Sequence, residues 1–392
     1  MPDRFRDGRY PPILVPDLME PYGKVKYPPQ EIGFDVPLGL SYGTSTRSGI
    51  DHVRKVDEIN DVMRWNGMEV PERNLGENRG NQDRYFVDNE KGIYAVADGV
   101  SMSDEGDLAA EQALAALKEF SKEPFRLETP ADTIEAAVAR WFLAYFRQAN
   151  ASIYDQALSD SVGAVGGVKN RSTTLVVART YVDRGGHPQL AVGVVGDCRA
   201  YLLDEGGDIV RLTNDNVDQI DPAQEINIRN EFLDNISLDD FNEMVRRYTA
   251  TIGKSPEQIS FDKMKMQHLE AWLRQRSMIS QGLGLQKELL FDPEIHLGIE
   301  LKRGMKIILC SDGIYDNLSR PDIQKIVVGA KDANRAAADL IAEAKKVAYS
   351  RSWRSKEDDM TALVVSVDDV IQGEMRFRQS SNFEETGEYR VE

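Results

Sequence analysis

The sequence predicts an α+β fold, a central sandwich of two antiparallel β-sheets flanked by helices. Two pairs of short apolar segments indicate the sheets: residues 173–180 with 190–196, and residues 199–204 with 208–213. A glycine-containing turn separates the members of each pair, which is typical of an antiparallel hairpin. Segments with apolar residues at helical spacing lie on both sides of these hairpins. The chain has 392 residues and 41% hydrophobic content, enough for a sizeable core.

The two ends of the chain differ in composition from the middle. The first 37 residues hold eight of the sixteen prolines together with three tyrosines. Proline prevents regular structure, whereas the aromatic residues favour an extended arm docked on another surface; a disordered leader is the alternative. We therefore treat residues 1–37 as a Pro/Tyr-rich N-terminal arm, residues 38–370 as the main domain and residues 371–392 as a polar C-terminal tail.

The first half of the main domain is predicted to contain one strand and two helices before the hairpins. Residues 38–45 have the pattern of a first strand. A helix is predicted over residues 103–120, with acidic residues at its start, where they suit the helix dipole. A second helix is predicted to begin at Thr129, with Pro130 in its first turn, and to continue to Ile153. The apolar faces of both helices are expected to belong to the core.

The second half of the domain returns to strands after a long polar stretch. Residues 214–281 leave the strand pattern for a polar, mostly helical sequence. The apolar segment 306–310 then predicts a buried strand. Helices are predicted over residues 320–326 and 333–349, and a last strand over residues 361–367.

Charge and cysteine content narrow the class of protein. A formal net charge of −17 argues against nucleic acid or an anionic membrane as the main partner, since phosphate-rich surfaces attract Lys and Arg. The two cysteines, Cys198 and Cys310, lie in apolar strand segments and are expected to be inert buried thiols; a redox or metal role is the alternative. Neither a signal-peptide core nor an apolar run of about 18 residues appears, so a cytoplasmic location is expected.

Five short motifs carry aspartates beside a glycine or at the end of an apolar segment. They are NQDR (81–84), ADGVS (97–101), VGDCRA (195–200), CSDGIYD (310–316) and DDMT (358–361). Four of them adjoin a strand-like segment, so their carboxylates can converge at strand ends. Such a cluster is tolerable only when protons or cations neutralise it, and hard oxygen ligands favour Mg²⁺ or Mn²⁺. For any one of these aspartates alone, the alternative is a turn or cap residue.

The order and wording of these motifs resemble the metal-dependent (type 2C) protein serine/threonine phosphatase family, particularly its bacterial branch. The resemblance runs from about Leu38 to Asp369 and makes residues 38–370 a phosphatase domain. It implies hydrolysis of phosphoserine or phosphothreonine on proteins by a metal-activated water, without a covalent enzyme intermediate. Residues 47–78 are then an insertion, and residues 214–281 an enlarged helical flap beside the active site.

The resemblance also implies which residues bind two Mn²⁺ or Mg²⁺ ions and a third, weakly held one. Asp98 is expected to bridge the two metals, and the backbone carbonyl of Gly99 to bind one of them. Asp312 and Asp358 complete the clamp, while Asp83 holds the second metal directly or through waters. The residues that resemble the third-metal pair are Asp197 and Asp316.

Three positions depart from the family pattern. Val100 replaces a histidine that many eukaryotic relatives are thought to use as a general acid. The arginine that grips the substrate phosphate is expected to be Arg79, with Arg47 and Arg54 displaced by the insertion; a solvated surface charge is the alternative for Arg79. The motif NDNVD (214–218) replaces a DHS-like motif of the family, so the resemblance does not predict which contacts the flap makes.

Other functions stay open beside protein dephosphorylation in signalling. One is a phosphatase of small phosphate compounds, and another is a catalytically silent or partner-regulated scaffold that binds phosphoproteins or a kinase. Loss of metal ligands would indicate the silent relative, but Asp98, Asp312 and Asp358 are all present. The expected partners are a phosphoprotein substrate and a cognate Ser/Thr kinase, not nucleic acid or a membrane. None of the four histidines matches a metal-binding spacing.

Overall fold

The structure is a computed structural model of the chain. It describes residues 30–35, 38–49, 80–128 except 102 and 104, 132–161, 169–215, 279–350 except 291, 354–370 and 374–379, with isolated positions between 53 and 69 and at 235 and 243. Most of the N-terminal arm, of the insertion 47–78 and of the flap 214–281 lies outside the described residues, as do Arg54 and Arg79. The boundaries assigned to these segments stay predictions.

Two five-stranded antiparallel sheets form the centre of the molecule, which confirms the predicted α+β sandwich. The first sheet has the strand order β10 (Glu294–Glu300), β7 (Pro188–Val195), β6 (Thr173–Val182), β4 (Ile93–Gly99) and β3 (Arg84–Asp88). The second has the order β2 (Leu38–Arg47), β12 (Met360–Val370), β11 (Lys306–Cys310), β8 (Arg199–Leu203) and β9 (Ile209–Arg211). The predicted hairpins are the pairs β6–β7 and β8–β9, so both are confirmed.

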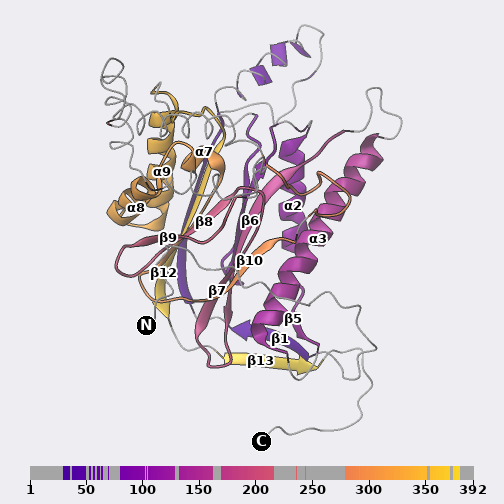
Figure 1. Ribbon diagram of the computed structural model, residues 1–392, viewed down its shortest axis with the longest axis vertical. Helices are drawn as coiled ribbons and strands as arrows, with labels where there is room; N and C mark the ends of the chain where they lie inside the picture. Colours follow the sequence, from indigo (N-terminus) through magenta and orange to yellow (C-terminus); the bar gives the residue numbers. More distant parts are fainter. Residues whose placement is uncertain are drawn as a thin grey trace, which may run out of the picture.

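Helices cover the outer face of each sheet, which gives four layers (Figure 1). The first sheet is covered by α2 (Gly106–Phe120) and α3 (Ile134–Ser161). The second is covered by α7 (Asp312–Tyr315), α8 (Arg320–Gly329) and α9 (Ala333–Ala348). Among the described helices, none has the length and apolar character needed to cross a bilayer.

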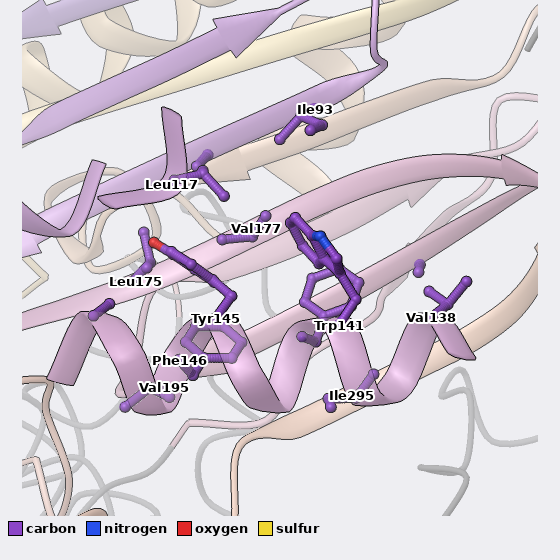
Figure 2. Packing of buried hydrophobic residues seen from close by; sticks show 14 of the residues in the cluster. Ile93, Leu117, Val138, Trp141, Tyr145, Phe146, Leu175, Val177, Val195 and Ile295 are labelled. Atoms are coloured by element: carbon purple, nitrogen blue, oxygen red, sulfur yellow. The ribbon is translucent and has the colours of Figure 1, made fainter. Parts of the chain in front are cut away.

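Burial on both faces explains why the central strands are continuous apolar runs instead of alternating ones. In β4, Ile93 and Ala95 pack against α2 and α3, whereas Tyr94 and Val96 face the second sheet. Figure 2 shows Trp141 and its neighbours on α3 directed toward the strands of the first sheet. Because strand side chains point alternately to opposite faces, each such strand contributes to two cores at once.

Helix boundaries differ in part from the prediction. The helix predicted from residue 103 begins at Gly106, and the two later helices are found close to their predicted positions as α8 and α9. The start predicted at Thr129 is wrong, because α3 begins at Ile134. Thr133 precedes it, and its Oγ1 accepts a hydrogen bond from the backbone N–H of Ala136 at 3.1 Å. A side-chain acceptor at that place satisfies one of the unpaired N–H groups of the first turn.

A third, small sheet joins segments from the two ends of the chain. Its strand order is β13 (Glu374–Gln379), β1 (Gln30–Asp35) and β5 (Phe125–Leu127), and both pairs are antiparallel. Figure 1 shows it at one end of the molecule, beside the beginning of α3. Part of the predicted arm and part of the predicted tail therefore pair with each other.

Candidate active site

The strand register places the aspartate motifs at a single edge of the sandwich. In the first sheet, Ala97 at the end of β4 lies opposite Arg84 at the start of β3. In the second sheet, Cys310 at the end of β11 lies opposite Ala362 near the start of β12. The chain therefore enters or leaves both sheets at one edge, beside a group of aspartates. We call this group the aspartate cluster; it consists of Asp83, Asp98, Asp197, Asp312, Asp316, Asp358 and Asp359.

Asp359 ties three separate segments of the cluster together. Its Oδ1 accepts the backbone N–H of Gly49 at 2.7 Å, and its Oδ2 accepts the backbone N–H of Gln82 at 2.7 Å. Asp359 is buried; its bond to Gly49 is buried, and its bond to Gln82 is partly buried. The end of β2 and the NQDR motif are thereby held against the start of β12.

Ser311 holds Asp83 in place. The Ser311 Oγ donates to Asp83 Oδ2 at 2.7 Å and accepts the backbone N–H of Thr361 at 2.9 Å. The other carboxylate oxygen of Asp83, Oδ1, is buried with no hydrogen-bond partner among the described residues. A buried oxygen without a donor is costly unless a proton or a cation supplies positive charge.

The glycines beside Asp98 and Asp312 allow close approach and do not form turns. Neither Gly99 nor Gly313 has a positive φ, unlike Gly196 before Asp197, whose φ is 95°. A Cβ on Gly99 would lie 2.5 Å from the backbone of Gly106, and a Cβ on Gly313 would overlap the carbonyl oxygen of Asp359. These two Asp-Gly pairs are therefore packing devices of the cluster, which argues against the simple turn interpretation.

Burial and mutual repulsion raise the pKa values of four clustered carboxyls, those of Asp83, Asp98, Asp197 and Asp312. The pKa of Asp83 is raised to about 7 by burial and then by Asp359. Burial, followed by Asp83 and Asp312, raises the pKa of Asp98 well above its ordinary value. The pKa of Asp197 is raised to about 7 by burial and then by Asp215. The cluster thus disfavours its own negative charge and needs bound cations to stay ionised at neutral pH.

One cation of the chain itself lies in the cluster. The Nζ of Lys356 is 3.0 Å from Asp316 Oδ2 and 3.1 Å from Asp358 Oδ2, and it also contacts Asp312 Oδ2. Burial alone would lower the pKa of Lys356, but these carboxylates outweigh it and raise it well above its ordinary value. In the described part of the chain, the carboxylates as they stand form no group of three placed to hold a metal ion.

A cleft of about 590 Å³ opens over the cluster. Its polar wall includes Asp98, Gly99, Asp197, Asp312, Lys356 and Asp358, and its apolar wall includes Val100, Ile279 and Leu285. Carboxylate oxygens are the ligands that hard divalent cations prefer, and the Oδ1 of Asp83 is buried without a donor among the described residues. By chemical type the residues present suit Mn²⁺ or Mg²⁺, although within the described residues no three of them are yet placed around a common ion position.

Each predicted metal ligand lies at this edge, whereas the predicted phosphate-binding arginine cannot be placed. Asp98, Gly99, Asp197, Asp312 and Asp358 line the cleft. Asp83 and Asp316 are buried directly behind it. Arg79 lies outside the described residues. Cys198 and Cys310 are buried thiols, as predicted.

Lys356, Asp359 and Ser311 were not predicted from the sequence. In the segment KEDDMT (356–361), Lys356 lies two residues before Asp358 and Asp359 directly follows it, and Ser311 precedes Asp312. A Lys two residues before a proposed ligand, and a second acidic residue beside it, were the signals available. Both are usually exposed side chains, so the sequence alone favours a solvated position for them.

A buried ion pair joins the cluster to the beginning of the flap. Arg199 donates through Nε to Asp215 Oδ1 at 2.8 Å and through Nη2 to Asp215 Oδ2 at 2.6 Å. The guanidinium also lies 3.5 Å from the ring centroid of Tyr315, whose hydroxyl donates to the carbonyl of Asp197. The NDNVD motif therefore contributes one contact of the flap segment, the bidentate pair of Asp215 with Arg199.

The comparisons with known proteins agree on one family. Residues 72–347 match the family model described as Protein phosphatase 2C. The crystal structure of a bacterial serine phosphatase has a TM-score of 0.50 at 16% identity, covering 85% of this chain and 100% of that one. At such identity this likeness shows the shared fold. No match is found among curated proteins.

Two further phosphatase structures are also similar to this chain. One is the catalytic domain of the serine/threonine protein phosphatase PstP in complex with two manganese ions, with a TM-score of 0.47, 19% identity, and 84% and 99% of the two chains covered. The other is the Ser-Thr phosphatase MsPP from Mycobacterium smegmatis in complex with cacodylate, with a TM-score of 0.48, 20% identity, and 86% and 100% covered.

The close approach of Gly313 to Asp359 gives a first testable prediction. Gly313→Ala should force β12 away from α7, because the new Cβ would overlap the Asp359 carbonyl. We expect a loss of about 1–3 kcal/mol in the free energy of unfolding, measured in urea. Gly329→Ala is the matched control, since no atom lies within 4 Å of its Cβ. Equal effects of the two substitutions would contradict the packing role.

The Arg199–Asp215 pair gives a second prediction. Asp215→Ala strands the buried charge of Arg199, so at pH 7 the protein should lose about 3–5 kcal/mol of unfolding free energy. Although burial raises the pKa of Asp215, Arg199 and Arg211 outweigh it and hold that pKa below its ordinary value of 3.8. The stabilisation is thus present above about pH 4 and disappears as the pH falls through the lowered pKa.

Urea unfolding of parent and variant at neutral pH and near pH 3 checks this sign. The difference between parent and Asp215→Ala should shrink on acidification. The double variant Arg199→Met with Asp215→Ala should recover most of the loss at neutral pH, because no buried charge is left without a partner. A difference that grows on acidification would show that the pair is not ionised as described.

Proposed function

The chain belongs to the protein phosphatase 2C family, and we propose that it hydrolyses phosphoserine and phosphothreonine on proteins with two bound Mn²⁺ or Mg²⁺ ions. Family membership makes it a protein serine/threonine phosphatase. The metal dependence, the residues that act and the nature of the substrate are the proposal.

The observation that carries the proposal is the charge of the cleft. Four carboxylates and a single ammonium line the described part of it. A phosphate dianion is repelled by such a wall unless additional cations are bound there. The raised pKa values of Asp83, Asp98 and Asp197 have the same cause, since each carboxyl is buried beside others. Divalent cations answer both needs, for they stabilise the carboxylates and attract the phosphate.

The residues that would hold the two ions are Asp98, the Gly99 carbonyl, Asp312, Asp358 and Asp83. When bound, the ions supply Lewis acidity that lowers the pKa of a water and neutralises the phosphoryl oxygens. Asp197 and Asp316 lie near the same edge and are the candidates for a third, weaker site.

The chain's own residues supply positioning. Ser311 orients the Asp83 carboxylate, and Asp359 fixes the NQDR motif through the Gln82 amide. The Thr173 hydroxyl donates to the carbonyl of Asp98 at 2.8 Å and holds the end of β4. Such outer contacts keep the ligands in place and are costly to remove in known metal sites. Val100 is apolar, so we assign protonation of the leaving group to water and not to that position.

A protein substrate is favoured over a small phosphate compound by the shape of the cleft. Val100, Ile279 and Leu285 give it an apolar side, and Leu285 is exposed. Ile279 also lies near the end of the flap segment 214–281. An apolar wall beside a charged centre suits the side chain that neighbours a phosphorylated residue in a peptide.

A silent or partner-regulated scaffold for phosphoproteins or a kinase is the second candidate. The contact of Lys356 with Asp312, Asp316 and Asp358 favours it, because an ammonium already neutralises part of the cluster. Asp83 and Asp98 argue against a scaffold, because neither has an ion-pair partner within the described residues. The two candidates differ in whether turnover appears when Mn²⁺ is added.

Metal dependence is the third prediction. Phosphate release from p-nitrophenyl phosphate and from phosphothreonine peptides should require Mn²⁺ or Mg²⁺, and excess chelator should abolish it while circular dichroism stays unchanged. Asp98→Asn and Asp312→Asn should each lower turnover by more than about 100-fold, since even outer-shell partners of metal ligands are worth 10–100-fold. Asp197→Ala should be milder, because Asp197 is not among the residues proposed to hold the two ions.

Asp183→Asn is the matched control for these substitutions. Asp183 is a half-buried turn aspartate whose Oδ1 accepts the backbone N–H of Gly185 at 2.8 Å, so the loss of its charge should leave turnover unchanged. Full activity in excess chelator would sink the metal mechanism. No turnover of any phosphopeptide with either ion would instead favour the scaffold.

The phosphate-binding arginine is the fourth prediction. Arg79→Ala should lower kcat/KM by roughly 10-fold or more while leaving the affinity for Mn²⁺ unchanged, because a guanidinium grips phosphate through paired hydrogen bonds. Arg47 is the last residue of β2 and lies opposite Met360, which follows Asp358 by two residues. Arg47→Ala is therefore the comparison variant. If Arg79→Ala is silent and Arg47→Ala or Arg54→Ala is crippling, the role belongs to a residue before the motif.

A further inference from the structure

Lys356 is built into the aspartate cluster and is not a surface side chain that happens to reach it. Its Nζ contacts oxygens of three carboxylates, and its side chain is 14% exposed. Three such contacts match the three donors of an ammonium group. The carboxylates come from two segments, α7 with the residue after it and the start of β12.

The backbone of Lys356 is fixed by a reciprocal pair of hydrogen bonds. The backbone N–H of Lys356 donates to Asn317 Oδ1 at 2.9 Å, and Asn317 Nδ2 donates to the carbonyl of Lys356 at 2.9 Å. Asn317 is fully buried, and its Nδ2 also donates to the carbonyl of Gly313 at 2.8 Å. The fold therefore sets the origin of the lysine side chain beside the Asp312 turn.

The cluster consists of two halves with different charge balance. Asp312, Asp316 and Asp358 share the Lys356 ammonium. On the other side, Asp83 and Asp98 have no ion-pair partner among the residues that the structure describes, and Asp83 Oδ1 is buried without a hydrogen-bond donor. One half thus contains a cation of the chain that balances one of its three negative charges, and the other half has no cation of the chain within the described residues.

We infer that the Lys356 ammonium permanently takes the place of one metal ion in the aspartate cluster, between Asp312, Asp316 and Asp358. The inference rests on the proposed function, in which Asp83, Asp98, Asp312 and Asp358 hold the two ions of the phosphatase. Lys356 is then a positioning residue: it holds Asp312 and Asp358, and it takes the place of the weak third ion for which Asp197 and Asp316 are the candidates.

Charge and geometry both support the exclusion. An ammonium 3.0 Å from Asp316 Oδ2 and 3.1 Å from Asp358 Oδ2 occupies the volume in which a cation shared by these oxygens would lie. A divalent ion there would meet a fixed positive charge in a poorly solvated place. Lys356 contacts the Oδ2 of Asp312, so the Oδ1 of that residue is left for a role toward the proposed ions.

Metal content tests the inference without reference to turnover. Parent, Lys356→Met and Lys306→Met are loaded with Mn²⁺, freed of excess metal by gel filtration and assayed for Mn²⁺ per chain by mass spectrometry of the element. Lys306 is the matched control, a partly buried lysine in β11 whose Nζ donates to the Val327 carbonyl at 2.9 Å. We expect one more Mn²⁺ per chain in Lys356→Met than in the parent, and the parent's value in Lys306→Met.

Thermal unfolding gives a second readout. In chelator, Lys356→Met should unfold several degrees below the parent, because two buried carboxylates and the half-buried Asp358 lose their cation. Added Mn²⁺ should close that gap, and it should not close any gap shown by Lys306→Met. Purification of Lys356→Met in Mn²⁺ throughout keeps the metal count measurable when the metal-free variant does not fold.

The outcomes separate this inference from the proposed function. A Lys356→Met variant with the parent's Mn²⁺ content and no greater response of Tm to Mn²⁺ overturns the inference and leaves the two-metal phosphatase intact. Mn²⁺ bound by Lys356→Met and absent from the parent supports the inference but overturns the proposed metal dependence of the parent. No Mn²⁺ in either protein overturns both.

Discussion

The close packing of like charges at one edge of the sandwich is the constraint on which the rest of the structure depends. Gly99 and Gly313 lack a side chain where the backbones of Gly106 and Asp359 approach, and the hydrogen bonds of Ser311 with Asp83 and of Gln82 with Asp359 bring the ends of the two sheets together. Each carboxylate there is then buried among others, which raises the pKa of Asp98 and its neighbours. The fold can keep this arrangement only with protons, an internal cation or metal ions, so stability and catalytic chemistry draw on the same electrostatic requirement.

Much of the fold could be predicted because its signals are local. The hairpins β6–β7 and β8–β9 join neighbouring segments through short turns, and α8 and α9 carry clear helical periodicity. The sheet of β13, β1 and β5 has no such signal, since it pairs residues 30–35 with residues 374–379 across almost the whole chain. The start of α3 was misplaced because Thr129-Pro130 and Thr133 both look like helix starts, and only the packed structure decides between them.

The candidate site divides in the same way. The aspartates were predictable as a set because five short motifs in one order are far more specific than any one of them. Ser311, Asp359 and Lys356 were missed because their roles exist only across tertiary contacts: Ser311 with Asp83, and Asp359 with two backbone amides. A lysine or an aspartate in a polar stretch is most often solvated, so the sequence wrongly favours a solvent-exposed position for Lys356 and Asp359. Asp215 lies in the motif NDNVD, which departs from the family pattern, yet it provides a buried partner for Arg199.

A cation fixed to the chain differs from a metal ion in one respect that matters for regulation. The Lys356 ammonium is held beside Asp312, Asp316 and Asp358 by its own backbone bonds to Asn317, so it is present at any metal concentration. Metal ions stabilise a folded state only in proportion to their free concentration relative to Kd. Because the ammonium balances part of the negative charge of Asp312, Asp316 and Asp358, the fold relies less on metal for the charges of that half. Binding at Asp83 and Asp98 is then free to control activity, and the apparent metal affinity of the enzyme can be weak without putting its fold at risk.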